Sequence, residues 1–202
     1  PPEVARGLFG HLIAAIRGTA QYRRASFLAG AKGKQVLSSL VDITEDPLIP
    51  RALGSSPFDG EGVVTKRREL VQSGVLQGYV LSSYSARRLG MPTTGNAGGV
   101  HNLLVRPTAG PLEELIKGCE QGFVVGELLG QGVDIVSGDY SRGAAGFWVE
   151  RGEIAHPVNE VTIAGNLRTM FKDIVMIGDD LRFRSSVASP TVKLERMTVA
   201  GT

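Results

Sequence analysis

Residue types that bind metals or act as nucleophiles are few in this chain and stand far apart. Its histidines are His11, His101 and His156, and Cys119 is its one cysteine. A catalytic metal needs several such side chains on converging elements, and zinc proteases commonly place two histidines one helical turn apart around a glutamate. No HExxH pattern occurs, and His11 stands alone among apolar residues, where a histidine is more often packed and hydrogen-bonded. Taken alone, these residues therefore provide few groups that could catalyse a reaction.

Two polar, glycine-containing segments are the other candidates for chemistry. Residues 91–102, MPTTGNAGGVHN, form a glycine-rich loop that lacks both the GxGxxG spacing and the Lys-Ser/Thr pair of a phosphate-binding loop. Two interpretations stay open for it: a tight turn between packed elements, or backbone that closely approaches a peptide or partner chain. The segment GDYSRG brings Asp139, Ser141 and Arg142 together, either as a polar site or as a turn held by Asp and Gly. No GxSxG motif of a serine hydrolase is present.

Composition limits the class of protein. The chain has 202 residues, of which 42% are hydrophobic and 21% charged, values that are ordinary for a folded globular domain. Its formal net charge is +2, which predicts no nucleic-acid partner, because such binders concentrate basic charge. No apolar run reaches the roughly 18 residues of a membrane-spanning helix, so no membrane partner is expected. The lone cysteine allows no intrachain disulfide and favours a reducing, cytoplasmic location.

The first half of the chain carries signals for both helices and strands. Residues 4–17 have apolar side chains at helical spacing, and residues 34–43 are typical of a strand. After a proline- and glycine-rich loop, Ser73-Gly74 predicts the turn of a hairpin. Further on, Ser82 can begin a short helix and Gly90 can end it.

Three consecutive basic residues, Lys66, Arg67 and Arg68, fall in the first strand of that hairpin. Charges along an edge strand keep it from pairing with other chains, so a solvated edge is the favoured interpretation. A contact with phosphate is the alternative.

In the second half, residues 111–130 are predicted to form one long helix, with a proline suited to its start. Gly118, Gly122 and Gly126 recur every fourth residue, so they would share a face against which another element packs closely. Cys119 would lie in this helix, in or near the core.

Strand signals are densest from residue 133 to residue 167, where Arg151-Gly152 predicts a hairpin turn. Asn166 can cap a helix over residues 167–175, and residues 191–201 alternate polar and apolar side chains as half-buried strands do. Helices and strands are mixed without a regular βαβ rhythm. We therefore expect an α+β fold, with a mixed or antiparallel strand-rich sheet and a few packed helices.

The strings SSYSARRLGMPTTGNAGGVHN and GDYSRGAAGFWVE carry a resemblance to the TldD/PmbA family that extends over essentially the whole chain. The resemblance implies that residues 1–202 are a C-terminal domain and that an N-terminal α/β domain precedes it in a longer chain. The Pro1-Pro2 start without an initiator methionine agrees with this expectation. The family is associated with a cytoplasmic metalloprotease of two homologous subunits that cleaves unfolded or modified peptides.

The resemblance also implies which subunit holds the metal. TldD-type subunits carry zinc on a helical HExxxH motif and on a cysteine near the C-terminus. His11 matches the first histidine, but Leu12 replaces the glutamate and Ile16 replaces the second histidine. Cys119 does not match the terminal cysteine. Because leucine and isoleucine can neither bind zinc nor activate water, we expect no cofactor on this chain and zinc on a homologous TldD-type partner.

A subunit without zinc would complete a shared cavity and peptide groove and would orient its active partner. Extended peptides are commonly bound along a sheet edge through main-chain hydrogen bonds. Because the two subunits are homologous, we also expect that this chain can form a homodimer when it is alone. The candidates for the groove or interface are Gly98, Gly99, His101, Asp139, Tyr140 and Arg142.

Two other functions stay open from the sequence. One is an autonomous hydrolase with an unfamiliar site that uses His101, Asp139 or Glu160. The other is a binding protein that modulates DNA gyrase, a role once given to the family, although neither the charge nor any motif of this chain supports it.

Overall fold

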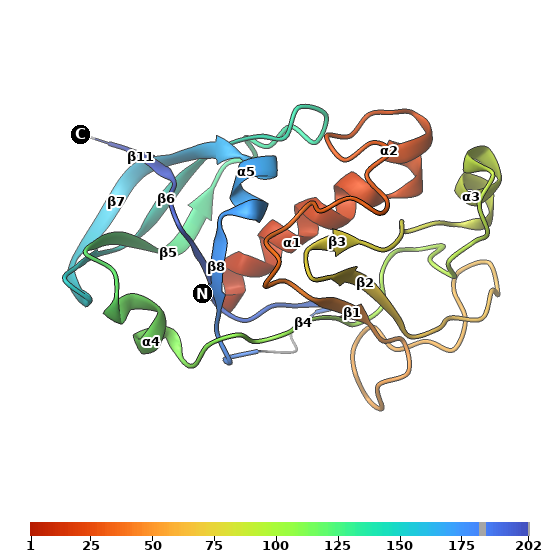
Figure 1. Cartoon of the computed structure of the whole chain (residues 1–202), viewed down its shortest axis with the longest axis horizontal. Helices are drawn as coiled ribbons and strands as arrows, with labels where there is room; N and C mark the ends of the chain where they lie inside the picture. The colour runs from red at the N-terminus through yellow and green to blue at the C-terminus, as the bar shows by residue number, and fades with distance from the viewer. Residues whose placement is uncertain (182–184, 202) are drawn as a thin grey trace.

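The computed structural model describes residues 1–181 and 185–201. Figure 1 shows one long helix, α1 (Pro2–Ile16), running through the middle of the molecule between two sheets. It confirms the helix predicted for residues 4–17, because its apolar residues recur at helical spacing and are buried on one side.

Five strands form the first sheet, in the order β3-β2-β1-β4-β9. They are β1 (Ile43–Glu45), β2 (Arg68–Gln72), β3 (Val75–Leu76), β4 (Leu103–Val105) and β9 (Val187–Ala188). All neighbours are antiparallel except β4 and β9. The hairpin between β2 and β3 turns at Ser73 and Gly74, as predicted, and both have the positive φ that a two-residue hairpin turn needs.

Four antiparallel strands form the second sheet, in the order β11-β7-β6-β5. They are β5 (Gln121–Leu129), β6 (Asp139–Glu150), β7 (Glu153–Asn166) and β11 (Thr198–Ala200). The long β6–β7 hairpin turns at Arg151-Gly152, where the sequence predicts a turn. Strand β5, at the edge of this sheet, pairs with β6 from the hairpin turn to Gly143.

The long helix predicted over residues 111–130 is wrong. Helix α4 (Leu112–Lys117) has six residues, and the chain then enters β5. Each glycine inside a helix costs about 1 kcal/mol relative to alanine, and the predicted segment has three glycines in its interior and a fourth at its end. Strand β6 instead supplies backbone partners along nearly all of β5, so Gly122 and Gly126 lie in a strand. Cys119 is half-buried in the connection before it.

Helix α3 (Ser83–Leu89) begins and ends where the sequence predicts. The Ser82 side chain accepts a hydrogen bond from the backbone amide of Ser85, and Gly90 ends the helix in the left-handed conformation. Helix α2 (Gly18–Tyr22) follows α1 directly and packs against α3.

The other predicted elements are shorter than expected. Helix α5 (Leu167–Lys172) is capped by Asn166, as predicted, but the chain then enters strand β8 (Ile174–Ile177). The single strand predicted at residues 191–201 is two strands, because β10 (Val192–Leu194) pairs with β8 whereas β11 pairs with β7.

The strand predicted over residues 34–43 is mostly irregular, since only its last residue enters β1. Its apolar residues Val36, Leu37 and Val41 are buried, as a strand pattern implies. However, the amides of Val36 and Leu37 both donate to the carbonyl of Gly74, so they form no regular ladder.

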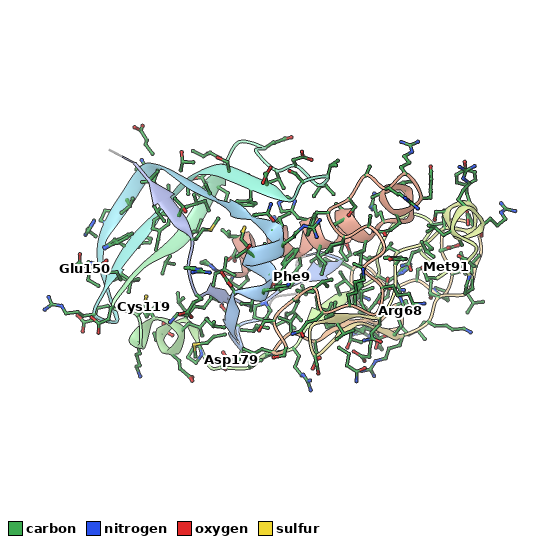
Figure 2. All side chains as sticks on the ribbon, turned by 45° about the horizontal axis from the view of Figure 1, so that its top comes forward. Phe9, Arg68, Met91, Cys119, Glu150 and Asp179 are labelled. Carbon is green, nitrogen blue, oxygen red and sulfur yellow. The ribbon has the colours of Figure 1, made fainter. Side chains whose placement is uncertain are left out.

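One apolar core joins α1 to both sheets. Leu12 and Ile16 belong to the same buried cluster as Ile43 of the first sheet and Ile163 of the second. Figure 2 places Phe9 in the interior. The predicted α+β class is confirmed, with helices packed on antiparallel and mixed sheets. Among the residues that the structure describes, no helix combines the length and the apolar character needed to cross a membrane.

Candidate functional site

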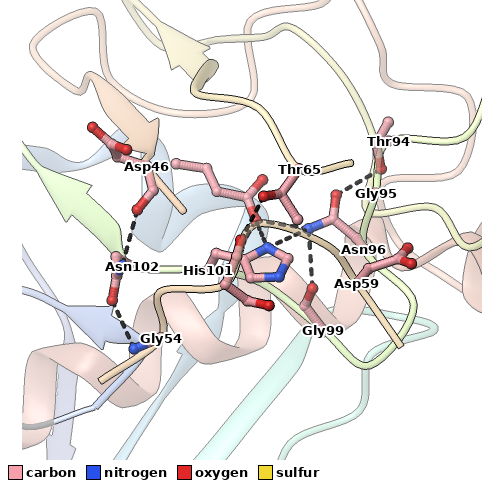
Figure 3. Close-up of polar contacts among 12 residues, drawn as sticks. Asp46, Gly54, Asp59, Thr65, Thr94, Gly95, Asn96, Gly99, His101 and Asn102 are labelled. Carbon is pink, nitrogen blue, oxygen red and sulfur yellow. Dashed lines mark hydrogen bonds and ion pairs between the residues drawn. The ribbon is translucent and has the colours of Figure 1, made fainter. Parts of the chain in front are cut away.

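Glu45, at the end of β1, is the common partner of several polar side chains, of which Asn96 and His101 are labelled in Figure 3. Its side chain is 2% exposed and accepts hydrogen bonds from the His101 backbone amide at 2.8 Å and from the Asn96 side-chain amide at 2.7 Å. The Nε of Arg68 lies 2.7 Å from the same carboxylate. A buried carboxylate is tolerated when its charge is paired and its lone pairs are used, and both hold here. We call Glu45, Arg68, Asn96 and His101 the Glu45 network.

Arg68 corrects the prediction that the whole basic run is a solvated edge. Lys66 and Arg67 are exposed, as predicted, but Arg68 turns inward. It also donates to the carbonyl of Tyr79 at 2.9 Å and to the side-chain oxygen of Asn96 at 3.0 Å. The charge of Arg68 is therefore used inside the molecule and not offered to a phosphate.

Asp59 holds the glycine-rich loop from another side. Its carboxylate accepts hydrogen bonds from the backbone amides of Glu61, Val63 and Ala97 at distances of 2.9 to 3.0 Å. Burial acts to raise the pKa of this carboxyl, but the three backbone bonds favour its charged form and lower the pKa below its ordinary value. Asp59 therefore stays charged near neutral pH and keeps the start of the loop in place.

The tip of the loop, Gly98-Gly99, lies between these anchors. Its two φ angles are +112° and +130°, and a β-carbon at Gly98 would meet no atom within 4 Å. Asn96 donates to the Gly99 carbonyl at 3.0 Å, and His101 Nδ1 lies 3.3 Å from the Glu45 carboxylate. The ends of the loop therefore form a packed turn, as the first interpretation predicts, and Gly98 at its tip is exposed backbone.

His11, Tyr140 and Arg142 form a second group, on α1 and β6, which we call the His11 cluster. The rings of His11 and Tyr140 meet edge to face with their centroids 6.0 Å apart. Burial lowers the pKa of His11, and the positive charge of Arg142 lowers it further. Burial raises the pKa of Tyr140, an effect that Arg142 partly offsets. At neutral pH the cluster therefore holds a neutral imidazole and a neutral phenol beside one fixed positive charge.

Arg142 is incompletely satisfied. Its Nη2 donates to the carbonyl of Leu128 at 3.4 Å, which is a long hydrogen bond. Its Nε is buried and is the one buried side-chain nitrogen or oxygen without a hydrogen-bond partner in the described residues. Leaving a buried donor unpaired costs roughly 1–3 kcal/mol. The His11 cluster therefore keeps a donor for which the surrounding protein supplies no acceptor.

Asp139 does not join the His11 cluster. The predicted turn GDYSRG is the beginning of strand β6, and the turn lies before it, at residues 134–138. Asp139 interacts with the Ser137 hydroxyl at 2.7 Å and the Asn166 side-chain amide at 3.0 Å. These two hydrogen bonds lower its pKa. The carboxylate thus braces the start of β6 against the cap of α5.

The three residues considered for an autonomous hydrolase are not brought together. His101 belongs to the Glu45 network, and Asp139 belongs to the cap of α5. Glu160 is exposed on β7, with a φ of +55°. No hydrogen bond or ion pair links any two of them within residues 1–181 and 185–201.

The side chains at the motif positions of α1 do not fit a zinc ion. Leu12 and Ile16 each have 0% exposure and belong to the apolar core. In the part of the chain that the structure describes, no three His, Cys, Asp or Glu side chains gather as metal ligands. His11 is thus the one nitrogen donor among the three motif positions.

An apolar cavity of 470 Å³ lies between the start of α1, α4 and the second sheet. Tyr140 of the His11 cluster, Trp148 and Cys119 are among the residues that line it. No sequence signal indicated this cavity, because its walls come from α1, α4, β5–β7 and residues 191–199, which meet only in the fold. The Glu45 network was missed for the same reason.

Known proteins resemble this chain in sequence. Residues 1–201 match the family described as the PmbA/TldA metallopeptidase C-terminal domain. The chain is 50% identical to Metalloprotease PmbA of Escherichia coli O157:H7, over 98% of this chain and 44% of that protein. It is 29% identical to a Metalloprotease TldD homolog of Haemophilus influenzae, over 93% of this chain and 44% of that protein. The chain thus spans less than half the length of these relatives.

Solved structures share the fold. A candidate modulator of DNA gyrase from Bacteroides thetaiotaomicron superimposes with a TM-score of 0.94 at 31% identity, over 100% of this chain and 46% of that chain. TldE from Thermococcus kodakarensis superimposes with a TM-score of 0.85 at 26% identity, over 97% of this chain and 48% of that chain.

Proposed function

The chain belongs to the PmbA/TldA metallopeptidase C-terminal domain family, and we propose that it is the zinc-free subunit of a two-subunit peptidase. It covers less than half of its relatives, so residues 1–202 are, in this proposal, the C-terminal domain of a two-domain chain with an N-terminal α/β domain. The zinc lies on a homologous TldD-type partner.

The observation that carries the proposal is the packing of α1. A zinc peptidase needs metal ligands and a base that activates water. The positions where the family resemblance expects them hold His11, Leu12 and Ile16, and the last two are fully buried in the core. A ligand at either position would put a polar group among apolar side chains. These positions support the fold, which favours placing the metal on the partner.

This chain would contribute shape and hydrogen-bond donors. The Gly98-Gly99 tip offers accessible backbone, and Tyr140 of the His11 cluster lines the apolar cavity. Backbone amides at such a tip can donate to the carbonyls of an extended peptide. In this proposal the chain completes a cavity that admits unfolded or modified peptides in the cytoplasm, and it forms a homodimer when its partner is absent.

Zinc content and peptidase activity test the proposal, measured on the protein alone and after co-purification with a TldD-type subunit. We expect near-stoichiometric zinc and peptide cleavage only in the co-purified sample. His11→Ala in this chain should leave the zinc content unchanged, whereas replacing the HExxxH glutamate of the partner with glutamine should abolish cleavage. Zinc and cleavage in the protein alone would overturn the proposal and favour an autonomous hydrolase.

The name of one similar structure, a candidate modulator of DNA gyrase, favours a second function. A chain that modulates gyrase directly has to bind it without the TldD-type subunit. A pull-down with the tagged protein from cells that lack that subunit separates the two functions. Captured gyrase would support direct modulation, and a blank result would count against it.

A further inference from the structure

Helices α2 and α3 pack together at the end of the molecule away from the second sheet (Figure 1). Their shared surface carries arginines and tyrosines that the proposed peptidase role does not use. The four arginines and one of the tyrosines are exposed. We call this surface the Tyr22 patch, and its members are Tyr22, Arg23, Arg24, Tyr84, Arg87 and Arg88.

Aromatic rings hold the patch in shape. The Cζ atoms of Arg23 and Arg88 lie 5.7 Å and 5.4 Å from the centroid of the Tyr22 ring, so one guanidinium from the residue after α2 and one from α3 stack on one tyrosine. Tyr84 meets the same ring edge to face at 6.0 Å. A stacked guanidinium keeps its N–H groups free at its edge and loses less side-chain freedom when it binds a carboxylate.

The charge of the patch is not neutralised by the protein. None of its four arginines forms an ion pair with another described residue. Glu61 is the acidic residue that reaches α3, and its carboxylate accepts a hydrogen bond from the Ser83 amide at 2.8 Å. The surface therefore keeps a concentrated positive charge although the whole chain carries only +2.

We propose that the Tyr22 patch is a docking site for an acidic polypeptide segment. Arginine and tyrosine are the residue types enriched where protein interfaces concentrate their binding energy. Carboxylates fit the free edges of stacked guanidiniums through paired hydrogen bonds. The compact patch favours a short acidic peptide over a nucleic acid, whose binding relies on many phosphate contacts along a charged stripe. Through Arg17, which directly precedes α2 and lies over Gly99, the patch continues toward the tip of the glycine-rich loop.

Fluorescence anisotropy with a labelled poly-glutamate peptide tests the proposal on the purified protein. We expect saturable binding that weakens with salt. The double substitution Arg23→Gln with Arg88→Gln should weaken binding about tenfold. Arg6→Gln with Lys117→Gln removes two exposed helical charges outside the patch and is the matched control, with an expected change below about twofold.

Substitutions of Tyr22 distinguish the contribution of ring stacking to peptide binding from the contribution of the arginine charges. Tyr22→Phe keeps the ring and should bind as the wild type does, whereas Tyr22→Leu should weaken binding about threefold with all arginines in place. Circular dichroism checks that each variant is folded.

Three outcomes would overturn the proposal: no saturable binding at physiological salt, equal losses in the patch variant and its control, or tighter binding of a single-stranded DNA of equal charge. The inference goes beyond the proposed function. Its assay uses neither zinc nor a TldD-type subunit, so its failure would leave the zinc-free role standing.

Discussion

The Glu45 network and the His11 cluster both place polar side chains against a sheet, but they differ in how completely their hydrogen bonds are satisfied. The Glu45 carboxylate has an arginine, a side-chain amide and a backbone amide as partners. Arg142 of the His11 cluster interacts with Tyr140 and makes one long bond to the Leu128 carbonyl, but its buried Nε has no partner. A saturated network anchors the chain, whereas the His11 cluster leaves a buried donor without a partner and so adds less to stability. The four predictions that follow test this difference.

Breaking the Glu45 network should have the largest effect. Glu45→Gln removes the charge that neutralises the largely buried Arg68, so we expect the free energy of unfolding to fall by about 3 kcal/mol. Urea unfolding measures it. Glu69→Gln, on the neighbouring strand and exposed, is the control and should change stability by less than about 0.5 kcal/mol. Equal small losses in both variants would show that the network is not an anchor.

Removing Asn96 should have the next largest effect. Its side chain joins Glu45, Arg68 and the Gly99 carbonyl, so Asn96→Ala leaves several buried groups unpaired and should cost about 2 kcal/mol. Hydrogen exchange should rise at residues 97–100. The exposed Asn159→Ala serves as comparison, and unchanged exchange in the loop of Asn96→Ala would contradict the anchoring role.

Arg142→Met should cost less, within about 1 kcal/mol, because the Nε donor that it removes has no partner and the bond from Nη2 to the Leu128 carbonyl is long. The same change should raise the pKa of His11, since the neighbouring positive charge is lost. NMR titration of the histidine ring resonances measures the pKa. A loss of stability like that of Glu45→Gln would mean that Arg142 is fully bonded in solution.

The smallest effect is a pH dependence from His11. Its folded-state pKa lies below the ordinary value of 6.5, because of burial first and Arg142 second. The unfolded chain therefore binds the proton more readily, and stability that is complete above pH 6.5 falls as the pH drops through and below that value. His11→Asn should remove this part of the decline in urea unfolding curves. An unchanged curve would show that His11 titrates normally.

Features made by residues close together in the chain were predictable from the sequence. The Ser73-Gly74 turn, the Ser82 and Asn166 caps and the Arg151-Gly152 turn lie where their residue types predict them. Each depends on the φ angle or on the side-chain oxygen of a residue within the turn or cap itself.

Predictions failed where a distant strand competed with a local pattern. Residues 121–129 pair with β6 although their glycine spacing suggested a helix face, and GDYSRG continues as a strand because β7 lies beside it. The sequence places Arg68 in an exposed basic run. In the fold, Glu45 on the neighbouring strand β1 pairs with Arg68, and the Arg68 side chain is largely buried.

The sequence by itself determined the family resemblance and the apolar residues Leu12 and Ile16 at the motif positions, because both are properties of residue identity at given spacing. Tertiary structure alone decided which polar groups meet. Glu45 and His101 are 56 residues apart, Glu45 and Asn96 are 51 apart, and Arg88 reaches Tyr22 from another helix. Such contacts form only when sheets and helices pack, so the spacing of side chains along one segment cannot predict them.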